Sequence, residues 1–129
     1  MEHQTTIDLI LDHYENPRHY GALPDADVVM RGINPGCGDV IAIYAKADDA
    51  GHISAISFEG EGCTISMAGA SMATEILWGK ALAEVEATPE AAILELFGRE
   101  IAATRFRCAL LGLNTAKDAA RALRSRQSG

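Results

Sequence analysis

The stretch F-E-G-E-G-C-T-I-S-M-A-G-A-S, residues Phe58 to Ser71, decides the fold because the apolar period of the sequence changes within it. Before it, residues 39–47 and 53–59 each place apolar side chains on one face of a predicted strand. After it, residues 63–78 repeat apolar positions at helical spacing, and Gly79 predicts the end of that helix. Strands followed by helices predict the α+β class, with a small antiparallel sheet covered by helices.

Further elements are predicted on both sides of that stretch. Residues 28–33 form another strand, which gives a sheet of about three strands. Thr5 with Asp8 predicts a capping box that opens a first helix, and Asn16-Pro17 ends it. Thr88-Pro89 predicts the start of a helix that runs to Phe97 and ends at Gly98. A last helix covers residues 107–124, and its predicted inward-facing residues are Leu113, Ala116, Ala120 and Leu123.

The composition predicts one globular domain over residues 1–129. The chain is 48% hydrophobic and only 22% charged, which excludes a disordered chain. Its apolar runs are too short to span a bilayer, and its first residues show no secretory signal. Three cysteines, an odd number, disfavour a fully disulfide-bonded secreted protein. We therefore expect a cytoplasmic protein with reduced thiols and no membrane partner.

The net charge of −7 is unevenly distributed along the chain. Residues 1–98 carry 4 basic and 16 acidic side chains, whereas residues 99–129 carry 7 basic and 2 acidic ones. In the basic tail, Lys117, Arg121 and Arg124 recur at helical spacing without interleaved aromatic residues. A solvated helix face or a docking face for an acidic protein explains this pattern better than nucleic-acid binding does.

Four residues are candidates for chemistry: Cys37, Asp39, Cys63 and Cys108. Cys37 lies between two glycines in the loop N-P-G-C-G-D, and Cys63 stands at the junction of a predicted strand and helix. Cys108 lies near the start of the last helix, close to Arg105. A helix N-terminus or an arginine stabilises a thiolate, which is the form that binds metals and attacks sulfur. Packing of inert thiols remains the alternative for each cysteine taken alone.

Three thiolates and one carboxylate suit a zinc ion or the edge of an iron–sulfur cluster. Their spacing is not that of a zinc finger or a ferredoxin, so spacing alone leaves metal binding open.

Other functional motifs are incomplete in this sequence. A phosphatase-type C-x5-R would need arginine where Gly69 stands, and Gly60-Glu61-Gly62 does not continue into a dinucleotide fingerprint. The histidines show no metal-binding spacing, so each is expected at the surface; they are His3, His13, His19 and His52.

Four stretches occur together in the order of a known family: D-H-Y-E-N-P-R-H-Y-G from Asp12, N-P-G-C-G-D from Asn34, the stretch from Phe58, and R-F-R-C-A-L-L from Arg105. Together they resemble the iron–sulfur cluster assembly scaffold proteins of the IscU, NifU N-terminal and SufU type, over nearly the whole chain. The resemblance implies a SufE/NifU-like α+β fold. It also implies a zinc or [2Fe-2S] site formed by Cys37, Asp39, Cys63 and Cys108. The implied partners are a cysteine desulfurase of the SufS, IscS or NifS type and apo iron–sulfur proteins.

The branch of the family stays open. The wording of the motifs is closest to SufU, and Arg107 stands where IscU-type proteins have histidine before the last cysteine. Residues 102–105 replace the IscU segment that a dedicated chaperone binds. The chain nevertheless lacks the insertion that SufU-type proteins usually carry before that cysteine.

Two functions therefore remain, and they are compatible. In the first, the protein accepts sulfur from the desulfurase on Cys37, or second on Cys108, and assembles a nascent cluster. In the second, it is a zinc-dependent sulfurtransferase that holds no cluster, so whether it is an enzyme stays open. Asp39 is expected to be the ligand that exchanges most easily, and Arg105 to offset the excess negative charge. A purely structural zinc module is the third alternative.

Overall fold

The structure is a computed structural model that describes residues 2–128. Within this range the chain forms three strands and six helices. In chain order they are α1 (Glu2–Glu15), β1 (Val28–Asn34), β2 (Asp39–Ala47), β3 (Ile53–Glu61), α2 (Thr64–Leu77), α3 (Leu82–Ala87), α4 (Ala91–Phe97), α5 (Arg99–Thr104) and α6 (Phe106–Ser128).

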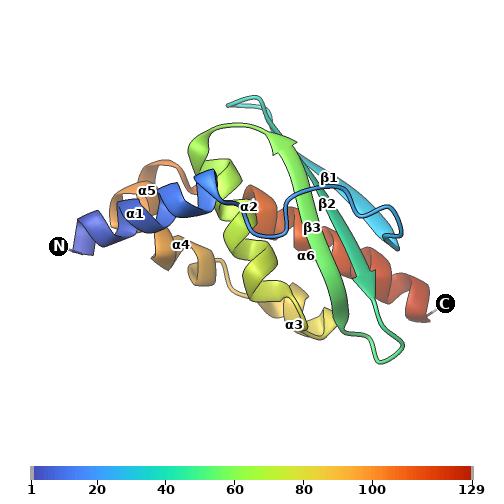
Figure 1. Cartoon of the computed structure of the whole chain (residues 1–129). Helices are drawn as coiled ribbons and strands as arrows, with labels where there is room; N and C mark the ends of the chain where they lie inside the picture. The colour runs from blue at the N-terminus through green and yellow to red at the C-terminus, as the bar shows by residue number, and fades with distance from the viewer. Residues whose placement is uncertain (1, 129) are drawn as a thin grey trace.

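The three strands form one antiparallel sheet in the order β1-β2-β3, as the sequence predicted. Helix α6 packs on β1 and β2, and α2 packs on β3 and on α6, so these two helices cover one face of the sheet (Figure 1). The α+β prediction is therefore confirmed. Asn34 pairs with Asp39 at the end of the β1–β2 hairpin, which places the loop of Cys37 at that end of the sheet.

The core lies between the sheet and the helices α2 and α6. Ile41 and Ile43 of β2 and Ile56 and Phe58 of β3 are buried, as the alternation of their strands predicted. The four residues of the last helix that were predicted to face inward are buried too: Leu113, Ala116, Ala120 and Leu123. Burial of this apolar surface is the main driving force that holds the helices on the sheet.

Helices α2 and α6 approach each other at two glycines. A Cβ atom on Gly69 would lie 2.4 Å from the carbonyl oxygen of Ala109, and one on Gly112 would lie 2.6 Å from the Cα of Ala70. No side chain larger than hydrogen fits such a backbone contact. The contact fixes the start of α6, which carries Cys108, against α2.

Helix ends were predicted correctly at Asn16-Pro17, Gly79 and Gly98, because α1 ends at Glu15, α2 at Leu77 and α4 at Phe97. The two glycines have a φ of +86° and +85°, a conformation that suits glycine. The predicted helix over residues 63–78 is confirmed with Cys63 and Trp78 as its two caps.

Two predicted helix starts are wrong. Helix α1 already begins at Glu2, so Thr5 lies inside it, and Asp8 accepts a hydrogen bond from Gln4 instead of closing a capping box. Thr88 does not open α4, which begins at Ala91. The Thr88 hydroxyl donates to the carbonyl oxygen of Glu84 at 2.8 Å, so this residue closes α3.

Helices α3 and α5 were not predicted, and α6 extends beyond the predicted range 107–124 at both ends. Two cations of its basic face, Arg121 and Arg124, form ion pairs with Glu86 of α3, so this part of the face is paired within the chain. Among the residues described, no helix is long and apolar enough to cross a membrane.

Candidate functional site

The site lies where the β1–β2 loop, the start of α2 and the start of α6 meet. The ligand atoms of Cys37, Asp39 and Cys108 lie within 4.8 Å of one another. The two sulfur atoms of this group, Cys37 Sγ and Cys108 Sγ, are 3.6 Å apart. The fold thus brings into contact two cysteines that are 71 positions apart in the sequence.

The loop that carries Cys37 is a tight turn closed by Asn34. The backbone N–H groups of Cys37 and Gly38 both donate to the carbonyl oxygen of Asn34, at 3.1 and 2.9 Å. Gly38 has a φ of +73°, which favours glycine at this position. The turn leaves Cys37 exposed, whereas Cys108 on α6 is only 2% exposed.

Cys63 is the N-cap residue of α2. Its sulfur accepts a hydrogen bond from the backbone N–H of Ser66 at 3.4 Å, in the position where a cap residue usually offers oxygen. Cys63 Sγ lies 3.9 Å from Asp39 Oδ2 and is therefore next to the group of Cys37, Asp39 and Cys108, although it is not one of the three mutually close ligands.

Asp39 links the sheet to the start of α2. It is 1% exposed, and its Oδ1 accepts the backbone N–H of Cys63 at 3.0 Å while its Oδ2 accepts the hydroxyl of Ser66 at 2.6 Å. Burial raises the pKa of Asp39, but hydrogen bonds with Ser66 and the Cys63 N–H, and then with Cys108 and Asn34, more than offset it and hold the pKa below its usual value. A Cβ atom on Gly62 would lie 2.7 Å from Asp39 Oδ1, so the glycine leaves room for the carboxylate.

Arg105, between α5 and α6, provides the positive charge that the sequence predicted near the cysteines. Its Nη2 lies 3.2 Å from Cys63 Sγ and 3.8 Å from Cys108 Sγ. Contact with the two sulfurs, Cys108 first, raises the pKa of Arg105 above its usual value. One guanidinium therefore bridges the cysteines that begin the two packed helices.

The environments of Cys63 and Cys108 shift the pKa values of the two thiols in opposite directions. Partial burial raises the pKa of Cys63, but hydrogen bonds from the hydroxyl and backbone N–H of Ser66, together with one from Cys108, outweigh it and leave the pKa below its usual value. Burial raises the pKa of Cys108 to about 11, and the hydrogen bond from Arg105 offsets only part of that effect. In the absence of a bound metal, Cys108 is therefore a neutral thiol at neutral pH, and Cys63 is the more acidic of the two.

Two residues of the site were missed in the sequence analysis. Asn34 is buried and donates from Nδ2 to Cys108 Sγ at 3.5 Å. Ser66 is fully buried and holds Asp39. Ser66 carried a usable signal, because it stands three residues after the cap residue Cys63, where a side chain reaches the helix N-terminus. Asn34 carried none beyond its place in the loop motif.

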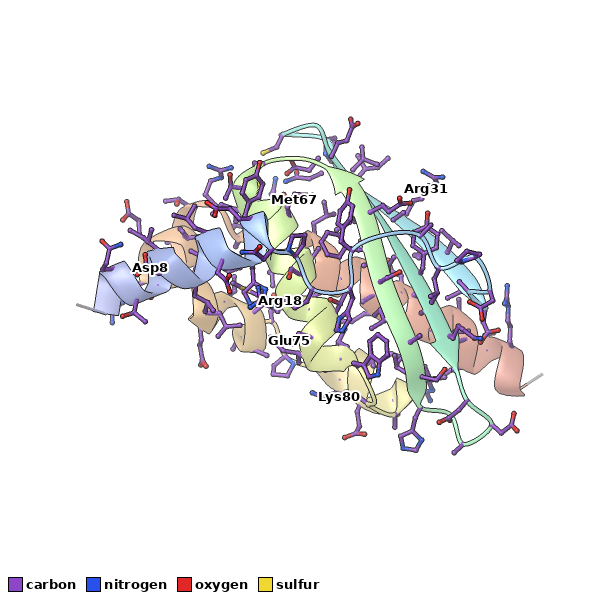
Figure 2. The ribbon with its side chains drawn as sticks, in the orientation of Figure 1. Asp8, Arg18, Arg31, Met67, Glu75 and Lys80 are labelled. Carbon is purple, nitrogen blue, oxygen red and sulfur yellow. The ribbon has the colours of Figure 1, made fainter. Side chains whose placement is uncertain are left out.

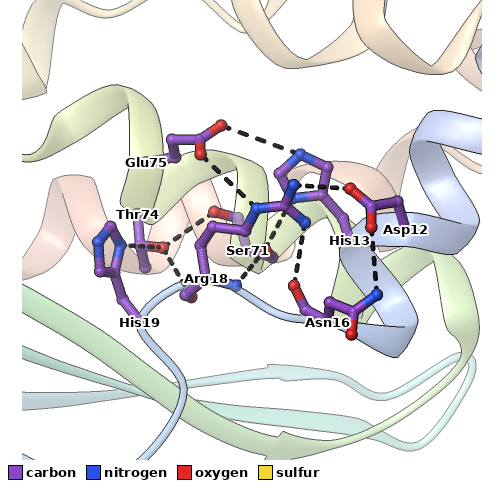
Figure 3. A network of polar contacts seen from close by, with 8 residues as sticks. All are labelled: Asp12, His13, Asn16, Arg18, His19, Ser71, Thr74 and Glu75. Carbon is purple, nitrogen blue, oxygen red and sulfur yellow. Dashed lines mark hydrogen bonds and ion pairs between the residues drawn. The ribbon is translucent and has the colours of Figure 1, made fainter.

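The motif D-H-Y-E-N-P-R anchors α1 to α2, and Figures 2 and 3 show its Arg18 beside Glu75 of α2. His13 Nδ1 is 2.7 Å from the hydroxyl of Ser71, which also accepts the backbone N–H of Arg18 at 2.8 Å. The Arg18 guanidinium lies 2.6 Å from Asp12 and 3.7 Å from Glu75. This network explains the motif by docking of the first helix.

The surface prediction for the histidines is therefore wrong for one of them. His13 is 3% exposed, because its ring is enclosed between α1 and α2. His19 and His52 are exposed, as predicted, and the side chain of His3 lies outside those that the structure describes.

The fold and the group of cysteines and aspartate at one end of the sheet define an α+β domain with a candidate metal-binding site. The chain belongs to the NifU-like N-terminal domain family, whose profile matches residues 5–128. This confirms the resemblance that the four sequence stretches indicated.

Two curated relatives represent both branches. The chain is 41% identical over 91 residues to the iron–sulfur cluster assembly scaffold protein IscU 1 of Archaeoglobus fulgidus, a match that covers 70% of this chain and 59% of the relative. It is 50% identical over 72 residues to the zinc-dependent sulfurtransferase SufU of Bacillus subtilis, a match that covers 56% of this chain and 48% of the relative. The chain thus matches only about half the length of each.

A solved structure agrees with the fold over most of both chains. The crystal structure of a putative iron–sulfur cluster assembly scaffold protein for the SUF system from Fervidobacterium islandicum superposes with a TM-score of 0.71 at 27% identity. The match covers 86% of this chain and 93% of that chain.

Proposed function

We propose that this protein is an iron–sulfur cluster assembly protein that accepts sulfur from a cysteine desulfurase. In this proposal Cys37, Asp39, Cys63 and Cys108 bind zinc or a nascent [2Fe-2S] cluster, and the cluster is delivered to apo-proteins. The observation that carries the proposal is the convergence of Cys37, Asp39 and Cys108 within 4.8 Å in a chain of this family. Three free thiols support a reducing cytoplasm as its location.

The geometry of the sulfurs fits a metal ion. Zinc binds thiolate sulfur at about 2.3 Å with tetrahedral angles, which places two such sulfurs about 3.8 Å apart. The observed separation of Cys37 Sγ and Cys108 Sγ is 3.6 Å, so both could bind one ion with little movement. Bound zinc would keep the thiols deprotonated.

The charge of the site supports the same conclusion. Three thiolates and one carboxylate carry four negative charges, of which a divalent ion neutralises two. Arg105 lies within hydrogen-bonding distance of Cys63 and close to Cys108, so its positive charge offsets part of the remaining negative charge. We assign Arg105 this supporting role.

Accessibility supports Cys37 as the first sulfur acceptor. Sulfur transfer requires that the attacking sulfur reach the persulfide of another protein. Cys37 is exposed in a glycine-flanked turn, whereas Cys108 on α6 is buried, so Cys108 is the second choice.

Two measurements on one preparation test the proposal. Protein purified without air or chelator is analysed for zinc and iron. The release of sulfide by a cysteine desulfurase in the presence of dithiothreitol is then measured with and without the purified protein. We expect about one zinc, or iron with sulfide, per chain, and stimulation that is lost in the variant Cys37→Ser. A metal-loaded protein that does not stimulate the desulfurase would contradict the sulfur-acceptor function.

The second candidate is a zinc-dependent sulfurtransferase that holds no cluster. The match to the Bacillus subtilis sulfurtransferase and the presence of Arg107 before Cys108 favour it. Anaerobic reconstitution with iron, sulfide and thiol separates the two functions. A visible absorption band that transfers to an apo-ferredoxin supports the scaffold, and a colourless protein that keeps its zinc supports the sulfurtransferase.

A structural zinc module is the weakest candidate because Cys37 lies in an exposed loop outside the buried core. A structural site predicts that Cys37→Ser unfolds the protein. A functional site predicts that this variant keeps its helical circular dichroism and loses activity.

A further inference from the structure

The contact between Cys37 and Cys108 joins an exposed thiol to a buried one. Their sulfurs are 3.6 Å apart, and the structure records no disulfide between them. We propose that Cys108 is a resolving thiol: it displaces the sulfur accepted by Cys37 as sulfide and leaves a Cys37–Cys108 disulfide. This inference rests on the proposed function, because it starts from a persulfide on Cys37.

The step balances without an added oxidant. The Cys108 thiol attacks the inner sulfur of the Cys37 persulfide anion and gives its proton to the departing outer sulfur, and a bond forms between the two cysteine sulfurs. The bond between the inner and the outer sulfur breaks, and the outer sulfur leaves with the electron pair as hydrosulfide. The transferred sulfur is thereby reduced by two electrons, and the two cysteines are oxidised to a disulfide. A dithiol reductant then returns both cysteines to thiols.

The geometry selects Cys108 over Cys63 for this role. Cys108 Sγ touches Cys37 Sγ, which is the inner sulfur of the persulfide. Cys63 is held instead as the cap of α2, where its sulfur accepts the N–H of Ser66 and contacts Arg105. Cys63 is also outside the group of ligand atoms that lie within 4.8 Å of one another.

The structure supplies the mobility and the orientation that the step requires. The sulfurs must approach from 3.6 Å to the disulfide length of about 2.05 Å. Gly36 and Gly38 flank Cys37, and Gly38 already has a positive φ, so the loop can adjust while α6 stays fixed. Asn34 Nδ2 and Arg105 Nη2 lie 3.5 and 3.8 Å from Cys108 Sγ and hold that sulfur toward the loop.

The experiment follows the fate of one sulfur atom. Protein purified anaerobically and free of thiols is mixed with a catalytic amount of a cysteine desulfurase and one equivalent of L-cysteine. The reaction is stopped with an alkylating agent, free sulfide is measured, and the intact mass of the protein is recorded. We expect wild-type chains to lose two hydrogens, and each such loss to match one sulfide. Non-reducing digestion should link the peptides of Cys37 and Cys108.

The variants Cys108→Ser and Cys108→Ala should instead keep the mass of one extra sulfur and release sulfide at least about tenfold more slowly. A control variant outside the site, Ser57→Ala, should still form the disulfide. Circular dichroism identifies which variants are folded, and the peptide link in the wild type tests the proposal independently of them.

The outcomes separate the two proposals. A wild-type protein that keeps the extra sulfur and forms no Cys37–Cys108 link overturns the resolving role while leaving sulfur acceptance intact. Disulfide formation between Cys37 and Cys63 overturns it as well. When neither the wild type nor a folded Cys108 variant gains sulfur or a disulfide, the proposed function itself has failed.

Discussion

Replacement of Ser66 by alanine tests whether Asp39 holds the start of α2. The Ser66 hydroxyl is fully buried and donates to Asp39 Oδ2 at 2.6 Å. A hydrogen bond to a charged group contributes about 1.5–3 kcal/mol, and the carboxylate loses it without access to water. The higher helix propensity of alanine returns only about 0.5 kcal/mol. We therefore expect Ser66→Ala to lower the free energy of unfolding by about 2 kcal/mol at neutral pH.

The matched control is Ser57→Ala. Ser57 is also buried, and its hydroxyl donates at 2.7 Å to the carbonyl oxygen of Gly21, which is a neutral acceptor. A neutral hydrogen bond contributes about 1 kcal/mol. Both variants are unfolded with urea and followed by circular dichroism, with a chelator present so that bound metal does not stabilise the folded state. The difference between the two losses measures the contribution of the charge on Asp39.

Acidification provides a second test of the same assignment. The folded structure holds the pKa of Asp39 below 3.8, so the stabilising contribution of the ionised carboxylate is present above that value. It is lost as the pH falls through the lower folded pKa. The excess loss in Ser66→Ala should therefore shrink at acidic pH, whereas the loss in Ser57→Ala should not. Equal losses in the two variants at neutral pH would refute the role given to the carboxylate.

Three further predictions concern packing and titration. Gly69→Ala should lower the free energy of unfolding by about 2 kcal/mol, because the new Cβ would lie 2.4 Å from the carbonyl oxygen of Ala109. The control Gly36→Ala places its Cβ at an ordinary 3.7 Å from Asn34 Oδ1 and should change the free energy of unfolding by less than about 1 kcal/mol. Equal urea midpoints for the two variants would contradict this prediction. Burial of the ring, and secondly the positive charge of Arg18, lower the pKa of His13 below 6.5. As the pH falls below 6.5, the free energy of unfolding should therefore decrease by up to about 1.4 kcal/mol per pH unit. The variant His13→Gln should remove this pH dependence. Burial raises the pKa of Cys108 to about 11, so zinc must displace the proton of this thiol when it binds. In competition titrations, the affinity of the protein for zinc should fall at least about tenfold per pH unit as the pH decreases from 8 to 6. A zinc affinity that does not change with pH would exclude Cys108 as a ligand.

The sheet and the long helices were predictable because their apolar residues repeat over many positions. Strand β2 was predicted with its observed bounds, Asp39–Ala47, and the range predicted for α2, residues 63–78, differs from the observed helix only by its two cap residues. Helices α3 and α5 have six residues each, too few for a helical period to appear in the sequence. The threonine at position 88 was assigned to the wrong helix because one hydroxyl can bond a preceding carbonyl as readily as a following N–H.

The candidate site was predictable in its residue types but not in its contacts. The loop of Cys37 carried its own signal, since a thiol between two glycines does not fit a buried core. The contact of Asn34 with Cys108 joins positions 74 residues apart, and nothing in the local sequence indicates it. His13 was placed at the surface for the same reason, because its buried partner Ser71 lies 58 residues away.

The contacts of Asp39 change which ligand a partner protein would displace. The sequence favoured Asp39 as the exchangeable ligand, because a hard oxygen binds a metal less tightly than thiolates do. In the structure both of its oxygens already accept hydrogen bonds, from the Cys63 N–H and the Ser66 hydroxyl, which hold the start of α2. Each oxygen has a second lone pair for a metal, but the carboxylate cannot swing away without leaving buried donors unpaired. Cys37 is exposed on a glycine-flanked turn, and its side chain does not hold the start of a helix. It can therefore leave a metal ion and return at a lower free-energy cost than Asp39. We therefore infer that ligand exchange and sulfur acceptance occur at the same atom, Cys37 Sγ, while Asp39 keeps its place in the fold.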